Sequence, residues 1–158
     1  METNLDIKYN LADIPLPNGV LRVDKVSVPT PTDIRLGHYT LSETFGKPVV
    51  ERKSKNVPEA TIISNGEYSL AMVNLTDWDK TEVLHPEGIH PVTYKCGLIQ
   101  NEKHIQSEDV MVTLMLWKKG YKEFSKKELT PVKSVKIADD KKSVTITFAD
   151  KTVKTVNF

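Results

Sequence analysis

The chain has 158 residues, of which 39% are hydrophobic and 27% charged, and a domain of this size buries about two-thirds of the surface that its unfolded chain exposes. Its 22 basic and 21 acidic side chains leave a formal charge of +1, so it lacks the overall positive field that attracts nucleic acid. No run of 18 apolar residues is present, so no membrane span is expected. The single cysteine, Cys96, excludes an internal disulfide and does not fix the compartment.

The N-terminal part is punctuated by proline, in "IPLPNG" (14–19) and "VPTPTD" (28–33). Because proline lacks an N–H, it is not expected in an inner strand. We therefore predict an arm or linker over 1–33, packed on a β-sandwich domain over 34–158, with one strand candidate inside it at "GVLRVDKVSV". Acidic residues also replace the basic start and apolar stretch of an export signal. A periplasmic or extracellular location is expected only for a fragment of an exported protein, and a cytoplasmic one otherwise.

The middle of the chain carries the clearest strand signals. In "TIISNGEYSLAMVNL", Asn65-Gly66 favours a type I′ turn, so we expect a hairpin. In "VMVTLMLW" (110–117) both alternating faces are apolar, which predicts a strand covered on both sides.

The last third predicts a short helix and then a meander. Ser125 and Glu128 stand at capping-box spacing in "FSKKELTP", and Pro131 ends the pattern. The tail then alternates in three short runs, broken at Asp139-Asp140 and Ala149-Asp150. Together these elements predict an all-β fold: a two-layer antiparallel β-sandwich of about eight to ten strands, with a wholly apolar interior and at most one short helix.

The stretch "HPEGIHPVTY" (85–94) is the first candidate site. His85, Glu87 and His90, with Cys96 nearby, offer atom types that bind zinc, but their spacing matches no established zinc pattern. Each histidine precedes a proline, which favours a stiff loop at a ligand-facing rim. We therefore expect no metal and no cofactor, and a small metal-dependent hydrolase or lyase that uses His85, Glu87 and His90 stays as the alternative.

The stretch "RLGHYT" (35–40) could supply a base, an acid and a cation in His38, Tyr39 and Arg35. Adjacent residues of a strand point to opposite faces, so His38 and Tyr39 share a site only if the strand is bulged. We expect no catalytic residues here.

The best binding candidate is Trp78 between Asp77 and Asp79 in "NLTDWDKTE". An indole with neighbouring carboxylates suits a sugar, whose C–H face stacks on the ring while its hydroxyls contact polar groups. The alternative is that Trp78 covers the edge of the core. We expect ligand contacts from Asp77, Trp78, Asp79, His85 and His90.

The stretches "DIRLGHYTL", "NGEYSLAMVNLTDWD", "LHPEGIHPV" and "VMVTLMLWKKGYKEFSKKELTPVKSV" resemble the C-terminal β-sandwich region of Bacteroidetes polysaccharide-processing proteins of the heparinase II/III-like kind. The resemblance covers about residues 33–136 and includes no catalytic signature. In such proteins a helical toroid carries much of the cleft, so the resemblance implies that this chain is an accessory β region whose catalytic residues lie mostly elsewhere, and none is assigned here.

We therefore expect a non-catalytic β-sandwich accessory module of a carbohydrate-active protein, which binds polysaccharide or packs against an upstream catalytic domain. Neither nucleic acid nor membrane is expected as a partner. An interaction protein of a cell or phage surface is a third hypothesis.

Overall fold

The computed structural model describes residues 6–43, 50–53, 59–84, 95–120 and 123–158. This part of the chain forms twelve strands and one short helix, α1 (Lys126–Leu129). The strands are β1 (Lys8–Leu16), β2 (Gly19–Ser27), β3 (Thr32–Glu43), β4 (Val50–Lys53), β5 (Thr61–Ser64), β6 (Tyr68–Asn74), β7 (Lys80–Leu84), β8 (Lys95–Ile105), β9 (Glu108–Lys119), β10 (Val132–Ile137), β11 (Ser143–Phe148) and β12 (Val153–Asn157).

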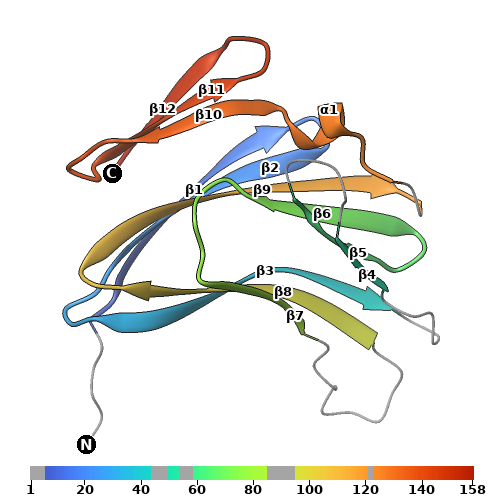
Figure 1. The fold of residues 1–158 in the computed structure, drawn as a ribbon, viewed down its shortest axis with the longest axis horizontal. Coiled ribbons are helices and arrows are strands. Elements are labelled where there is room, and N and C mark those ends of the chain that lie inside the picture. Colours follow the sequence, from blue (N-terminus) through green and yellow to red (C-terminus); the bar gives the residue numbers. More distant parts are fainter. Residues whose placement is uncertain (1–5, 44–49, 54–58, 85–94, 121–122) are drawn as a thin grey trace, which may run out of the picture.

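The strands form three antiparallel sheets in three layers. A six-stranded sheet, ordered β1-β2-β9-β6-β5-β4, lies in the middle. The β10-β11-β12 sheet covers one of its faces and the β3-β8-β7 sheet covers the other (Figure 1). The predicted all-β antiparallel class is confirmed, but the described chain has more strands than expected and a third layer. The third layer arises because the tail meander covers one face of the central sheet as a separate sheet.

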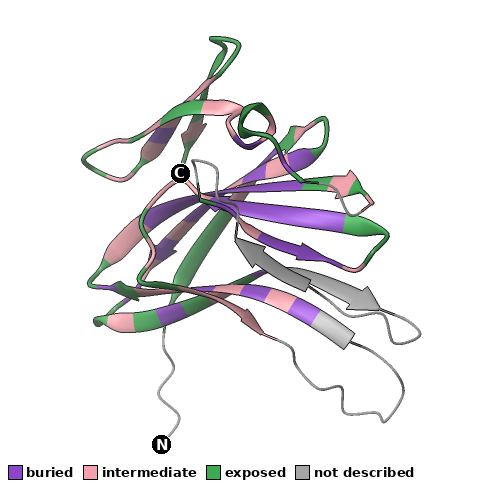
Figure 2. Cartoon of the chain, turned by 45° about the vertical axis from the view of Figure 1, so that its right-hand side comes forward, coloured by how far each residue is buried: buried purple, intermediate pink, exposed green. Residues whose placement is uncertain are grey.

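Strand β9 explains why the central sheet needs cover on both faces. All residues from Val110 to Leu116 are buried, as its two apolar faces predicted. The even-numbered residues of this run join the core beneath the β10-β11-β12 sheet, to which α1 adds Leu129. Met111 and Met115 join two smaller clusters on the opposite face. Figure 2 shows the resulting concentration of buried residues along the central sheet.

Much of the expected N-terminal arm belongs to the central sheet. Strands β1 and β2 form a hairpin around Pro17-Asn18, and β2 also pairs with β9 along its length. Pro15 lies in β1, an edge strand, where a missing N–H is tolerated. The boundary at residue 33 stays a prediction, although residues 8–27 supply two strands of the sheet.

The hairpin expected at Asn65-Gly66 is confirmed, since β5 pairs with β6. Its turn is not type I′, which needs positive φ at both central residues. Gly66 has φ 90°, and Asn65 is not among the described non-glycine residues with positive φ. Instead the Asn65 side-chain oxygen accepts hydrogen bonds from the N–H groups of Glu67 and Tyr68, both at 2.9 Å.

The helix and the tail also follow the prediction. Ser125 and Glu128 form the full capping box of α1. Strands β10, β11 and β12 pair in sequence as a meander. The two turns between them place Lys141 and Lys151 at positive φ. In the described part of the chain, no helix has the length and apolar character needed to cross a membrane.

Candidate functional site: a polar cavity beside Trp78

The layer between the central sheet and the β3-β8-β7 sheet contains a band of polar residues. Along β9, Thr113 lies between Met111 and Met115, which belong to the two apolar clusters of this layer. Thr113 is fully buried and pairs with Arg22 on one side and Asn74 on the other. The prediction of a wholly apolar interior was therefore wrong. A polar row crosses the sheet because β-pairing places residues distant in sequence side by side.

On the opposite side of this layer the polar band continues into a hydrogen-bond network. Asn101 of β8 is fully buried, and its amide nitrogen donates to Asn74 Oδ1 at 3.0 Å. Thr81 of β7 donates to Asn101 Oδ1 at 2.5 Å and accepts from Asn74 Nδ2 at 3.0 Å. Since each residue holds the other two, the three side chains have fixed orientations.

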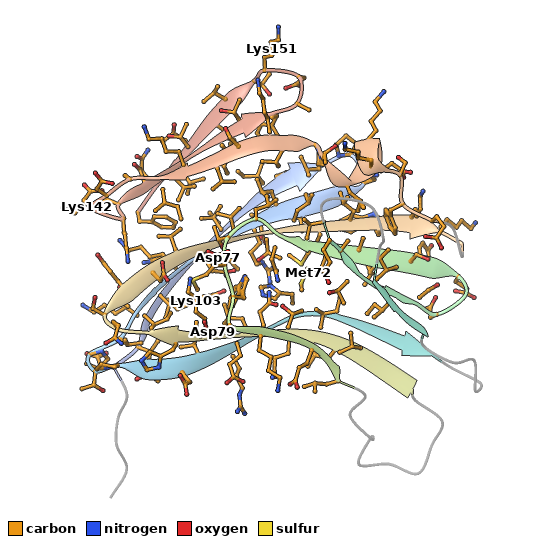
Figure 3. The ribbon with its side chains drawn as sticks, in the orientation of Figure 1. Met72, Asp77, Asp79, Lys103, Lys142 and Lys151 are labelled. Carbon is orange, nitrogen blue, oxygen red and sulfur yellow. The ribbon has the colours of Figure 1, made fainter. Side chains whose placement is uncertain are left out.

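This network forms part of the wall of a cavity of about 320 Å³. The lining residues come from strands β5, β6 and β7, from the β6–β7 connection and from Glu59, which precedes β5. Thr76 in this connection accepts from the N–H of Val112 at 3.0 Å, which leaves its hydroxyl hydrogen available to a ligand. Figure 3 shows Met72 between the two sheets, and Asp77 and Asp79 on the segment that crosses from one to the other. The lining residues are Glu59, Thr61, Met72, Asn74, Thr76, Asp77, Trp78 and Thr81.

Trp78 both packs on the core and lines the cavity. The side chain is half-buried and packs against the cluster that contains Val26 and Ile105. Its indole Nε1 is buried and makes no hydrogen bond to a described residue. The two interpretations of Trp78 drawn from the sequence are therefore compatible, because one ring can cover the edge of the core and still border the cavity.

The other predicted ligand-binding residues divide into three groups. Asp77 is exposed and lines the cavity beside Trp78. Asp79 is exposed but is not a lining residue, and its carboxylate accepts from the N–H of His104 at 2.6 Å. His85 and His90, together with Glu87, lie outside the described residues.

The second sequence candidate, "RLGHYT", does contain a bulge. The β3–β8 register shifts between Gly37 and Tyr39, so His38 is the extra residue. His38 is buried, and burial followed by the nearby Arg22 charge lowers its pKa to about 4. The Tyr39 side chain lies outside the described part, so the pairing of His38 with Tyr39 stays untested.

Arg35 is not part of a site with His38. Its side chain is 67% exposed and pairs with Glu102 at 3.0 Å on the neighbouring strand β8, whereas His38 is buried inside. A buried imidazole and a solvent-facing guanidinium cannot contact one substrate together. The predicted absence of catalytic residues in this stretch stays a prediction.

Sequence reasoning missed a buried carboxylate at the other end of the same layer. Asp24 is fully buried, and its Oδ1 accepts a hydrogen bond from the Tyr9 hydroxyl. Its Oδ2 has no hydrogen-bond partner among the described residues. Burial raises the pKa of Asp24, and burial with the Asp24 hydrogen bond raises that of Tyr9. The available signal was Asp24 itself, an acidic residue within the alternating run "VLRVDKV".

Metal ligands are not grouped in the described chain: outside the gaps, no three His, Cys, Asp or Glu side chains are placed to hold one ion. Cys96 lies in β8, and its side chain is outside the described part.

Fold and site together define an all-β protein of three antiparallel sheets with a polar cavity at the edge of its inter-sheet layer. Its structure is similar to that of heparan sulfate lyase HepC from Pedobacter heparinus, with 16% sequence identity and a TM-score of 0.49. The match covers 99% of this chain and 26% of the lyase, so the chain spans about a quarter of that protein's length. No protein-family model and no curated protein matches the sequence.

Proposed function

We propose that the chain is a non-catalytic β-sheet module of a carbohydrate-active protein and binds polysaccharide in the cavity beside Trp78. The observation that carries this proposal is the lining of the cavity, where a half-buried indole borders hydroxyl, amide and carboxylate groups. A sugar presents an apolar C–H face and a ring of hydroxyls, and concave sites with an aromatic wall and a few placed polar groups suit such ligands.

The rigidity of the polar wall supports a binding role. Asn74 and Thr81 are held by each other and by the buried Asn101. A wall that is already ordered loses little conformational entropy when a ligand binds, which favours affinity. The cavity volume of about 320 Å³ lies at the low end of the range for small-molecule sites.

The non-catalytic part of the proposal is supported by the position of His38. This imidazole is buried and is not among the residues that line the cavity. The alternative, a metal-dependent hydrolase or lyase using His85, Glu87 and His90, lies on residues outside the described part and stays a prediction.

The test is affinity electrophoresis in gels that contain one polysaccharide each, with Trp78→Ala and Trp78→Phe beside the wild type. We expect retardation by at least one polysaccharide, at least about tenfold weaker binding for Trp78→Ala, and an intermediate value for Trp78→Phe. Trp117→Ala is the matched control, because Trp117 is 37% exposed and does not line the cavity. Circular dichroism checks that each variant is folded. Absence of binding to every polysaccharide, or equal losses for Trp78→Ala and Trp117→Ala, would contradict the proposal.

A further inference from the structure

We propose that Lys103 is a positioning residue for the binding site beside Trp78. Its ammonium group, held by Asp109, fixes the connection between β6 and β7 (residues 75–79), which forms one wall of the cavity. The inference rests on the proposed function, because it concerns how that wall is ordered before a ligand binds.

The β6–β7 connection crosses from the central sheet to the β3-β8-β7 sheet and is tied to both at its ends. The N–H of Leu75 donates to the carbonyl of Val112 in β9 at 3.0 Å. The N–H of Asp79 donates to the carbonyl of Glu102 in β8, also at 3.0 Å. A connection without regular structure opens more readily than the strands that it joins. The middle of the connection therefore needs an anchor of its own.

Lys103 supplies this anchor. Its Nζ donates a hydrogen bond to the backbone carbonyl of Asp77 at 2.9 Å. Among the described residues, Asp77 and Trp78 make no other hydrogen bond. Figure 3 shows Lys103 beside the connection that carries Asp77 and Asp79. Loss of the ammonium group would therefore leave Asp77 and Trp78 without a hydrogen bond to either sheet.

Strand alternation directs Lys103 toward the inside of the layer. Asn101 and Ile105, two positions away on either side in β8, are buried, so the three residues share the inner face. A charge at such a place needs partners, and the Asp109 carboxylate of β9 lies 2.8 Å from the ammonium. The two side chains are only 18% and 25% exposed, so solvent and salt screen this pair less than a surface pair.

Asp109 is itself held in place. Its Oδ1 accepts a hydrogen bond from the N–H of Val110 at 2.9 Å, and the Lys141 ammonium lies 3.9 Å from the same oxygen. The carboxylate that holds Lys103 is therefore anchored to the central sheet. The order of the connection thus depends on an ion pair between β8 and β9 whose two members do not line the cavity.

An ordered wall loses less conformational entropy on binding than a mobile one. We therefore expect Lys103→Met, which keeps an unbranched side chain and removes the donor, to weaken polysaccharide binding about three- to tenfold. Lys103→Arg should restore most of the affinity, because a guanidinium can donate to the same two acceptors. Lys141→Met is the matched control, since Lys141 also contacts Asp109 but makes no described contact with the connection.

The experiment combines hydrogen–deuterium exchange of the free protein with affinity electrophoresis in a polysaccharide gel that retards the wild type. In Lys103→Met we expect faster exchange in peptides that cover residues 75–79 and unchanged exchange in peptides of β11, because the loss of order is local. If Lys103→Met does not fold, Asp109→Asn replaces it. That variant removes the charge that holds the ammonium, and it should change exchange and affinity in the same direction.

The outcomes separate this inference from the proposed function. Wild-type exchange over residues 75–79 in Lys103→Met would overturn the inference, whether or not a ligand is known. Faster exchange with unchanged affinity, or equal losses of affinity in Lys103→Met and Lys141→Met, would overturn the role of Lys103 in binding and leave the proposed function standing. The same holds if Lys103→Arg binds no more tightly than Lys103→Met. Absence of binding by the wild type to every polysaccharide would overturn the proposed function, and the exchange measurement would then decide by itself whether Lys103 fixes the connection.

Discussion

The imidazole of His38 meets the indole of Trp78 edge to face, with ring centroids 5.7 Å apart and ring planes at 82°. His38 is the extra residue of the β3 bulge, and both of its ring nitrogens are buried without a described hydrogen-bond partner. Trp78, which lines the cavity, therefore packs against His38. Protonation of His38 would place a charge in a buried environment without a described hydrogen-bond partner, which raises the free energy of the folded protein. The bulge thereby connects the protonation of His38 to the stability of the layer that carries Trp78.

We predict that the protein loses stability in mild acid through His38. Its folded pKa of about 4 lies below the ordinary value of 6.5. As the pH falls through 6.5 the unfolded chain binds a proton that the folded protein does not, so the free energy of unfolding decreases until about pH 4. The loss over this window is about 3 kcal/mol. Urea unfolding at several pH values between 4 and 7.5 measures it.

His38→Gln is the control for this prediction, because it removes the imidazole to which the loss is assigned. Between pH 7.5 and pH 4, we expect the free energy of unfolding to decrease more for the wild type than for His38→Gln. Parallel curves for the two proteins would show that His38 has no part in the loss.

Tyr9→Phe is expected to lower the free energy of unfolding at pH 7 by about 1–3 kcal/mol. The change removes the only described donor to the Asp24 carboxylate, whose second oxygen already lacks a described partner. Urea unfolding at pH 7 measures the loss.

Asp24→Asn should lower the free energy of unfolding by less than Tyr9→Phe does, since burial already favours the uncharged form of this group. The double variant tests the contact, because its loss should fall short of the sum of the two single losses. Additive losses would mean that Tyr9 stabilises the strand in another way.

Local patterns in the sequence were sufficient for individual elements. The two apolar faces of Val110–Leu116, the Asn65-Gly66 hairpin and the capping box of Ser125 and Glu128 each depend on residues within one short stretch. Local patterns did not establish how the sheets stack. Which strands share a sheet depends on pairing between distant segments, such as β2 with β9.

The candidate site divides in the same way. Trp78 and Asp77, which line the cavity, were predicted as ligand contacts because an indole with neighbouring carboxylates within one short stretch suits a sugar. Arg22, Asn74 and Thr113 were missed as a polar row, because only strand register makes them neighbours. The available signal was Thr113, a polar residue in the middle of an apolar strand, which indicates that the interior is not wholly apolar.

Asn101→Leu is expected to weaken both stability and binding. Leucine has a similar size but removes the hydrogen bonds that Asn101 makes to the part-buried side chains of Asn74 and Thr81, at a cost of about 1–3 kcal/mol. Because both residues line the cavity, glycan affinity should also decrease. Urea unfolding and calorimetry measure the two effects. Glu82→Gln, a substitution on the same strand as Thr81 at a residue that pairs with Lys80, is the control and should preserve both properties. Unchanged glycan affinity in a folded Asn101→Leu protein would argue against an ordered polar wall as the binding surface.

Gly19→Ala is expected to be among the most damaging of single-methyl additions. A Cβ at Gly19 would lie 2.3 Å from the carbonyl oxygen of Met115 and 2.8 Å from Leu116 Cδ2. The oxygen belongs to the backbone of β9, an inner strand that pairs with both β2 and β6, so it cannot move aside without disturbing the ladders. We expect the free energy of unfolding to decrease by about 3 kcal/mol, which lowers the melting temperature of a chain of this size by about 6–12 °C.

Gly37→Ala is the matched comparison, since its Cβ would lie 3.2 Å from Leu98 Cδ1, the end of a side chain that can rotate. That variant should lose less than about 1 kcal/mol, and equal shifts for the two variants in a thermal melt would contradict the argument.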